Sequence, residues 1–402
     1  MRAIQRFWVC FTACVITLYL MCVVDNDQIR YPSYENGKLF GFRNNDVIHT
    51  KMHNNEYCIA YDFLESTESF REDGLEPITL ATHGTSDMIK EMESKPSNWD
   101  GPISVGVFLD FHSRDALEYL SDVHRCDKEF RKKVSVHFAF RLSAFQNECP
   151  SIRLKKRNIT CEEFEKKRSQ MRKTITAPFQ LYPSNLMRNI ARHGAKSEIH
   201  FLADADMEFS EGFATRVKKI ANEMVDGRNK NVLVVRRFEY ENITELPENH
   251  VELKQMMDRK QIFEFHHKFF FSGHQIKNIS YWFNVSDSHK EVVAWQIPYA
   301  SNLWEVQVIL HRNDLYNADY FPARIKVMQS LIYSLCRANY TFHLLSHVFD
   351  LHEGVKLADT DYSKAVIAHG RKFGRSKAHN RFRKETDELY PKTEKRCEKF
   401  VM

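Results

Sequence analysis

Short apolar runs alternate with stretches of helical periodicity in the first half of the chain, and this alternation is the strongest constraint on its fold. The runs lie at residues 78–82, 103–111 and 134–142. Ser86 and Ser113 precede the two intervening stretches, and serine is a preferred residue at the start of a helix. A strand–helix–strand–helix–strand series predicts a parallel sheet with helices on both faces. We therefore expect an α/β fold with a Rossmann-like, mostly parallel sheet.

A pair of carboxylates follows the next strand of this pattern. After a charged insertion over residues 143–176, a helix that ends at Gly194 leads into the apolar strand 199–203. Asp204 and Asp206 come directly after this strand. Open α/β sheets bind ligands beyond the carboxyl ends of their strands, and hard divalent cations prefer oxygen ligands. The two aspartates are thus candidate cation ligands, although acids before a helix are also common as simple N-terminal charges.

The N-terminus carries an uncharged, mostly apolar stretch over residues 7–24. As a helix it would be about 27 Å long, which is just enough to span a bilayer. Arg2 and Arg6 precede it and Asp25 and Asp27 follow it, so the positive-inside bias directs the rest of the chain into the lumen. A cleaved signal peptide is the alternative, but no small-x-small site closes the apolar run. We expect a transmembrane helix that makes the chain a single-pass type II membrane protein.

Cysteines and glycosylation acceptors favour the secretory pathway. Six cysteines follow the apolar stretch, and in an oxidising compartment they can form up to three disulfides, whose pairing the sequence leaves open. The chain also has five Asn-x-Ser/Thr acceptors, where chance would give about two. The predicted N-glycosylation sites are Asn158, Asn242, Asn278, Asn284 and Asn339.

The composition argues against nucleic-acid binding and sets the size of the core. The chain has 402 residues, 43% of them hydrophobic, which suffices for one large core or two modest ones. Its net charge is only +5, and no basic stripe is interleaved with aromatic residues. From N- to C-terminus we expect a cytosolic tail 1–6, an anchor 7–24, a luminal stem 25–75, a donor-nucleotide-binding half 76–240 and an acceptor-binding half 241–402.

Several other classes of enzyme do not fit the chain. Phosphatases of the haloacid dehalogenase type carry Thr or Val two residues after the second Asp, where this chain has Glu208. The zincin, α/β-hydrolase and P-loop motifs are absent from the sequence. The pair His266-His267 has no further ligand at metal-binding spacing, so we interpret it as surface or packing histidines. Sugar transfer from a nucleotide donor does fit, because a cation would neutralise the charge on the departing diphosphate.

Motifs spread over residues 75–397 make the chain resemble glycosyltransferase family 49, which contains β-1,4-glucuronyltransferases and one domain of the bifunctional xylosyl-/glucuronyltransferase that builds matriglycan. The most specific are Tyr-Pro-x-Asn-x-x-Arg-Asn at 182–189 and Asp-Ala-Asp-Met at 204–207. Further matches are residues 79–83, 99–105, 295–296, 304–305 and 352–356. The resemblance implies a GT-A fold, a UDP-sugar donor and Mn²⁺.

The resemblance also implies roles for residues around the diphosphate. Asp204 and Asp206 would bind manganese, with Asp204 also contacting the UDP ribose, and His352 would be the third metal ligand. Lys356 would contact the diphosphate. A histidine and a lysine four residues apart lie on one face of a turn or helix, so both could reach the same phosphates.

Other roles implied by the resemblance concern the uridine and the acceptor. Thr82 and His83, at the end of the first strand, correspond to a uridine-contacting position. Arg188 and Asn189 in the signature helix either support the donor pocket or simply cap and pack. Family members invert the anomeric carbon, which needs a carboxylate near the acceptor hydroxyl. Glu305 is our candidate for this base or for an acceptor contact, with a structural salt bridge as the alternative.

The chain departs from the family over residues 297–326. The family usually has an acid where this chain has Ile297, and extra residues separate Pro298 from Trp304. Residues 316–326 replace an acidic stretch that contains Gly-Phe-Asn in the family. Because this region would shape the sugar and acceptor pockets, the donor stays open between UDP-glucuronate and UDP-N-acetylglucosamine.

We therefore predict an inverting, metal-dependent glycosyltransferase of the Golgi membrane that moves a sugar, with glucuronate as the first choice, to a glycan or glycoprotein acceptor in a β-linkage. The alternative enzyme is a β-1,3-N-acetylglucosaminyltransferase. The alternative from another class is a catalytically silent GT-A protein that binds glycans or a partner transferase. The sequence leaves open whether the chain forms a homo-oligomer or a complex with another glycosyltransferase.

Overall fold

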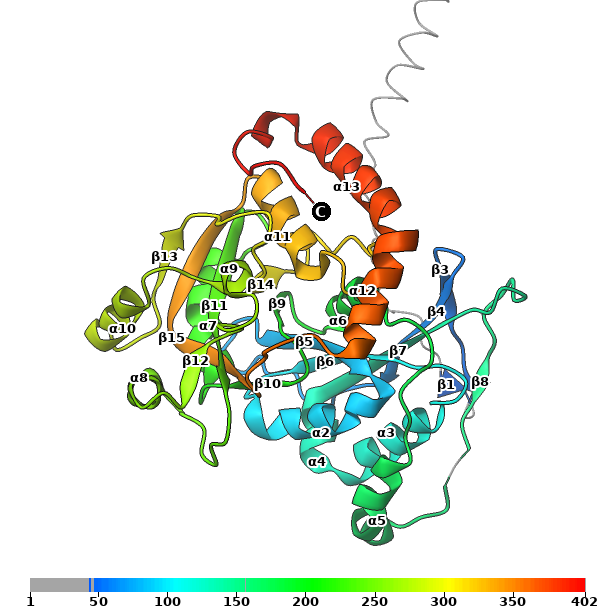
Figure 1. The fold of residues 1–402 in the computed structure, drawn as a ribbon. Helices are drawn as coiled ribbons and strands as arrows, with labels where there is room; N and C mark the ends of the chain where they lie inside the picture. The colour runs from blue at the N-terminus through cyan, green and yellow to red at the C-terminus, as the bar shows by residue number, and fades with distance from the viewer. Residues whose placement is uncertain (1–42, 45–46, 156, 402) are drawn as a thin grey trace, which may run out of the picture. The chain divides into compact units, whose positions relative to one another are not determined.

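A mixed sheet runs through the part of the chain that the computed structural model describes, which is residues 43–44, 47–155 and 157–401 (Figure 1). These residues belong to one compact unit, Phe40–Met402. The sheet order is β10 (Met207–Phe209), β15 (Thr341–Glu353), β11 (Asn231–Tyr240), β14 (Gln307–His311), β9 (Ile199–Leu202), β5 (Ile78–Thr85), β6 (Ile103–Phe108), β7 (Val134–Arg141), β4 (Tyr57–Leu64) and β3 (Lys51–His53). Two short strands extend it, β12 (Ile262–Glu264) on β11 and β13 (Ala294–Ile297) on β15.

The strand–helix alternation predicted for residues 78–142 is confirmed. β5, β6 and β7 are parallel neighbours, and β9 joins them in parallel on the other side of β5. Parallel strands need crossover connections, and helices supply them. These helices are α2 (Ile89–Asn98), which follows the short turn η1 (Ser86–Met88), then α3 (Asp115–Cys126) and α4 (Lys128–Lys133), and they lie on one side of the strands in Figure 1.

The fold-class prediction needs correction on two counts. The sheet is mixed rather than mostly parallel, because β14 runs antiparallel between β9 and β11 and five further pairings are also antiparallel. The prediction also included a transmembrane helix, and no helix in the described residues has the length and apolar character to cross a membrane. The expected span itself, residues 7–24, lies outside the described residues.

Alternate residues of the central strands face two separate hydrophobic cores. Leu80 and Phe201 contribute to one core and their neighbours Ala81 and Leu202 to the other. Because strand side chains point alternately to opposite faces, a strand buried on both sides is apolar throughout. The first core is covered by α2, α3 and α7 (Phe213–Met224), the second by α10 (Ile279–Ser288), α11 (Val327–Arg337) and α13 (Arg375–Leu389).

The remaining elements surround these two layers. α6 (Ser184–Gly194) packs on β5, β6 and β7. A small separate sheet contains β1 (Arg43–Asn44), β2 (Val47–Ile48) and β8 (Ile152–Arg153). The other helices are α5 (Cys161–Lys173), α8 (His250–Asp258), α9 (Phe271–His274), α12 (Asp361–Phe373) and the turn η2 (Pro391–Thr393).

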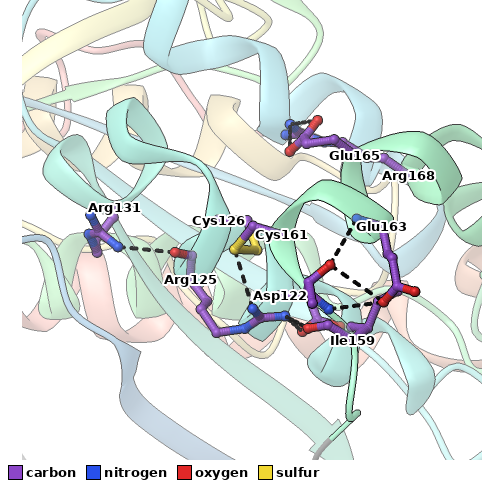
Figure 2. The surroundings of a disulfide bond; sticks show 10 residues. Asp122, Arg125, Cys126, Arg131, Ile159, Cys161, Glu163, Glu165 and Arg168 are labelled. Atoms are coloured by element: carbon purple, nitrogen blue, oxygen red, sulfur yellow. Dashed lines mark hydrogen bonds and ion pairs between the residues drawn. A yellow bond between two sulfur atoms is a disulfide. The ribbon is translucent and has the colours of Figure 1, made fainter.

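The six cysteines that follow residue 24 form three disulfides, the most that six cysteines can form. The pairs are Cys58–Cys149, Cys126–Cys161 and Cys336–Cys397. Figure 2 shows the second pair, which joins the end of α3 to the start of α5. α5 begins with a capping box between Thr160 and Glu163, so the insertion over 143–176 contains a properly started helix.

Part of the range predicted as a stem lies in the main sheet. β4 pairs with β7, and its Cys58 is fully buried. The predicted tail 1–6, the anchor and the stem residues before 43 lie outside the described part of the chain. The boundary expected at residue 240 between a donor half and an acceptor half stays a prediction.

Candidate active site

The turn after β9 brings the candidate metal ligands to one edge of the sheet. The carboxylates of Asp204 and Asp206 follow β9, and the chain then enters β10 at Met207. β10 pairs antiparallel with β15, and Met207 lies opposite His352. This register places the Oδ2 atom of Asp206 3.3 Å from the Nε2 atom of His352. Two residues that are far apart in sequence thus meet at one point.

The imidazole of His352 is oriented by a backbone carbonyl. Its Nδ1 atom lies 3.2 Å from the carbonyl oxygen of Gly354, and a carbonyl only accepts hydrogen bonds, so Nδ1 carries a proton. Gly354 has a φ of +92°, a conformation that glycine adopts at little cost. Burial lowers the pKa of His352, but the hydrogen bond and charge of Asp206 outweigh burial and the net shift is upward. Such a fixed Nδ1–H is typical of histidines whose Nε2 binds a metal.

Asp204 is held between two arginines. Its Oδ1 accepts a hydrogen bond from Arg188 at 2.9 Å, and its Oδ2 accepts one from Arg237 at 3.0 Å. Burial alone would raise the pKa of Asp204, but Arg188 and Arg237 hold it well below its usual range. Asp204 is therefore an ionised carboxylate whose two oxygens both contact guanidinium groups, unlike the more exposed Asp206.

Arg237 is a site residue that the sequence reasoning missed. It lies on β11 next to Asp350 of β15, with 3.9 Å between the Nε and Oδ1 atoms, and its guanidinium lies 3.8 Å above the ring centre of Phe265. Asp350 is fully buried, and burial raises its pKa to about 8 although Arg237 opposes this shift. The charged pair Arg236-Arg237, directly after the apolar run 232–235, was the signal that could have revealed it.

The residues predicted to contact uridine lie beside this centre. Thr82 and His83 are buried near the end of β5, and His83 shares a hydrogen bond with the hydroxyl of Tyr182. Burial, reinforced by the charge of Arg188, lowers the pKa of His83 to about 3, while Asp204 opposes the shift. Within the described residues, the Thr82 hydroxyl and the Nε2 atom of His83 have no hydrogen-bond partner. Two buried polar groups are thus left for a ligand or water to satisfy.

Glu305, the candidate base, belongs to the same cluster. Its backbone N–H donates to the carbonyl of Gly273 at 2.7 Å, and its Oε2 atom lies 3.5 Å from the side-chain amide of Gln329. Burial raises the pKa of Glu305, and the charges of Arg237 and Asp204 act on it in opposite directions. A half-buried carboxylate with a raised pKa beside the paired aspartates suits a proton acceptor.

Lys356 is near the cluster but has its own acidic partner. Its Nζ atom lies 2.8 Å from Asp359 and 4.1 Å from the ring centre of Phe269. Its charge also acts on His266 and His274, which are hydrogen-bonded to each other at 3.0 Å. To contact a diphosphate, the ammonium of Lys356 would have to leave Asp359 or bind Asp359 and the phosphate at the same time.

The pair His266-His267 and the glycosylation acceptors are also accounted for. His267 is bonded to the buried Glu239 at 2.8 Å and stacks on Phe263, in line with a packing role. The five predicted acceptor asparagines are all exposed, and their occupancy stays a prediction.

The fit of a metal rests on the pair Asp206 and His352. In the ranges that the structure describes, no group of three or more His, Cys, Asp or Glu side chains is arranged to hold a metal ion. The pair nevertheless places a carboxylate oxygen and an imidazole nitrogen 3.3 Å apart, and the hydrogen bond to the carbonyl of Gly354 fixes the orientation of the imidazole. Both donor types suit a first-row divalent cation. These residues fit an ion that takes its other ligands from a bound substrate and water.

Comparison with known proteins gives the family. Residues 77–391 match the glycosyltransferase family 49 profile, described as "glycosyl-transferase for dystroglycan". The chain belongs to this family. It is therefore a glycosyltransferase, as the motifs at residues 182–189 and 204–207 predicted.

Curated relatives are similar at modest identity. β-1,4-Glucuronyltransferase 1 of Homo sapiens is 26% identical over 347 residues, which cover 80% of this family 49 chain and 77% of the human protein. The xylosyl- and glucuronyltransferase LARGE2s of Danio rerio is 22% identical over 267 residues, which cover 66% of this chain and 29% of the fish protein.

Solved structures give only distant matches. The structure of GalNAc-T7 with UDP, GalNAc and Mn²⁺ matches with a TM-score of 0.39 and 10% sequence identity. The match covers 71% of this chain and 45% of the GalNAc-T7 chain. S. aureus TarS 1-349 in complex with UDP-GlcNAc has a TM-score of 0.35 at 12% identity, over 71% of this chain and 60% of that one.

Proposed function

We propose that the enzyme transfers glucuronate from UDP-glucuronate to a glycan acceptor, in a metal-dependent reaction that inverts the anomeric carbon. The observation that carries the proposal is the contact of Asp206 with His352, at 3.3 Å, beside the arginine-bound Asp204. The two named glucuronyltransferase relatives support the choice of donor sugar.

Asp206 and His352 are the residues that would hold the manganese. When bound, the ion supplies positive charge that stabilises the departing diphosphate. Asp204 stays a predicted ligand. Because its oxygens contact Arg188 and Arg237, these two guanidinium groups would position Asp204 and neutralise part of the site's negative charge. The buried, unpartnered groups of Thr82 and His83 would hydrogen-bond the nucleoside.

Glu305 would act as the base. In a single displacement the acceptor oxygen forms a bond to the anomeric carbon as the bond from that carbon to the phosphate oxygen breaks, and the acceptor proton passes to Glu305. Burial raises the pKa of Glu305, which makes the carboxylate a better proton acceptor at neutral pH. Gln329, 3.5 Å away, orients one carboxylate oxygen and leaves the other for the acceptor.

We also propose that the enzyme works in the Golgi lumen. Disulfides persist in oxidising compartments, and three link distant parts of this chain. The five exposed Asn-x-Ser/Thr acceptors support the same compartment. Mass analysis before and after glycosidase treatment of the protein from secretory cells would reveal which acceptors carry glycans.

A ligand-binding experiment tests the proposed function. UDP-glucuronate, UDP-N-acetylglucosamine, UDP-glucose and UDP are added to the purified protein with Mn²⁺ or with a chelator, and thermal unfolding is followed. A ligand at 100 times its dissociation constant stabilises the folded state by about 2.7 kcal/mol. We expect this stabilisation with UDP-glucuronate and Mn²⁺, and its loss with the chelator.

The matched variant Asp206→Asn keeps the size of the side chain but loses its charge. We expect it to abolish the Mn²⁺-dependent stabilisation, whereas Asp361→Asn, at a fully exposed aspartate, should leave it unchanged. No stabilisation of the wild-type protein by any uridine nucleotide would overturn the proposal.

A further inference from the structure

In the part of the chain that the structure describes, the ammonium group of Lys326 has no acidic partner, and its charge acts on the candidate base Glu305. It precedes α11, is half-buried, and its Nζ atom donates to the backbone and side-chain oxygens of Asn302 at 3.3 and 3.5 Å. Among the described residues, no carboxylate lies within ion-pair distance of it. An ammonium has three donors and prefers an anion when it is removed from water.

The surroundings of Lys326 leave its charge only partly compensated. Burial lowers its pKa to about 8, Glu305 opposes this shift by its negative charge, and Arg375 adds a like charge. Lys326 and Gln329 belong to the same helix start, and Gln329 contacts both the carbonyl of Leu303 and the carboxylate of Glu305. The start of α11 therefore brings both the ammonium of Lys326 and the amide of Gln329 to the surroundings of Glu305, the group that would receive the acceptor proton.

We propose that Lys326 binds the carboxylate of a hexuronic acid residue and thereby selects an acidic sugar. This inference rests on the proposed function and adds the residue that recognises the carboxylate of the sugar. A single negative charge fits better than a phosphate, because Glu305 is close enough to repel a dianion. The site proposed for the diphosphate is at Asp206 and His352, which leaves Lys326 for the sugar.

The alternative is that Lys326 acts only through Glu305 or through the fold. Its charge lowers the pKa of Glu305, so its loss could change the base for every substrate alike. Acidic and neutral sugars separate the two explanations. UDP-glucuronate and UDP-glucose differ only at C6, and methyl β-glucuronide and methyl β-glucoside differ in the same way.

The test measures binding of these four compounds by calorimetry, with Mn²⁺ present, to the wild-type protein and to Lys326→Gln. We expect Lys326→Gln to lower the affinity for the acidic ligand about tenfold, equivalent to about 1.4 kcal/mol. The affinity for the matching neutral ligand should fall less than twofold. If only the affinity for UDP-glucuronate falls, Lys326 binds the carboxylate of the donor sugar. If only the affinity for methyl β-glucuronide falls, Lys326 binds a carboxylate of the acceptor. Lys364→Gln, at an exposed lysine, is the matched control and should change neither.

A second variant keeps the lysine. Asn302→Asp places a carboxylate on the residue that Lys326 already contacts, so it should compete with the sugar and reproduce the selective loss. Equal losses for acidic and neutral ligands, or no preference of the wild-type protein for either acid, would overturn the proposal. If the wild-type protein binds no uridine nucleotide, the proposed function fails, and the two methyl glycosides still report on Lys326.

Discussion

At the scale of single residues, two aspartates separated by one residue have different surroundings and different proposed roles. Asp206 is exposed and contacts His352, whereas Asp204 forms ion pairs with Arg188 and Arg237. The difference follows from the strand positions, because β9 ends before Asp204 and the entry into β10 directs Asp206 toward β15. A sequence motif of alternating acids thus describes two sites with distinct electrostatic environments.

Replacement of Glu305 by Gln tests the proposed base. The amide keeps the contact with Gln329 but does not accept a proton, so we expect kcat to fall by about 10²- to 10⁴-fold. Binding of UDP should change little, because Glu305 is assigned to the acceptor rather than to the nucleotide. The measurement pairs UDP release under saturating donor with calorimetric titration of UDP.

Glu291→Gln is the control for this change, since Glu291 is a highly exposed carboxylate that pairs with Lys219. It should leave kcat unchanged. A Glu305→Gln enzyme with near-normal turnover would assign the proton transfer elsewhere and return Glu305 to a structural role.

At the scale of elements, the sequence predicted the parallel half of the sheet and missed its longest strand. The runs at β5, β6 and β7 are short, apolar and separated by helices, so periodicity reveals them. β15 carries several polar residues among its apolar ones, so no simple alternation predicts a strand there. Two of these have structural reasons: His347 is at a backbone irregularity with a φ of +65°, and Asp350 belongs to the candidate site.

The same reasoning explains which site residues could be predicted. Asp204 and Asp206 follow a recognisable strand, and His352 was found through a family motif. Arg237 depends on the neighbour of β11 in the sheet, and the pairing of β11 with β15 is a long-range contact that local patterns do not encode. The mixed character of the sheet was missed for the same reason, since β14 is inserted from a distant part of the chain.

Removal of one disulfide should loosen one helix. In the variant Cys126→Ser with Cys161→Ser, the link between α3 and α5 is lost, and the chain-entropy estimate for a 35-residue separation is about 4 kcal/mol. Arg168 and Arg172 still pair with the buried Glu93, so we expect α5 to loosen rather than detach. Hydrogen exchange should show lost protection over 161–173, with β5 to β7 still protected.

The variant Cys58→Ser with Cys149→Ser provides the comparison. That disulfide ties the loop after β7 to β4, so its loss should leave the exchange of α5 unchanged. Unaltered protection of α5 in the first variant would mean that the ion pairs alone hold this helix.

At the scale of the whole molecule, two fully buried histidines, His137 and His200, are held in the neutral form. His137 accepts a hydrogen bond from the backbone N–H of Asp62 at Nδ1, so its Nε2 bears the proton and faces the hydroxyl of Ser104. Burial and then the charge of Lys196 lower its pKa to about 3. His200 is also fully buried, and burial lowers its pKa well below the usual range.

These histidines predict a loss of stability in mild acid. Their folded pKa values lie below the unfolded value of about 6.5, so the unfolded chain binds more protons and the free energy of unfolding falls as pH drops below about 6.5. Between pH 7.5 and 5.5 each should remove roughly 1.4 kcal/mol. Urea unfolding at both pH values measures the change in the free energy of unfolding. The variant His137→Gln has one buried neutral histidine fewer, so its free energy of unfolding should fall by roughly 1.4 kcal/mol less than that of the wild-type protein. The raised pKa of Asp350 acts in the opposite direction over this pH range, so the decisive quantity is the difference between the two proteins. Equal changes in the wild-type protein and in His137→Gln would show that His137 is not buried in the neutral form.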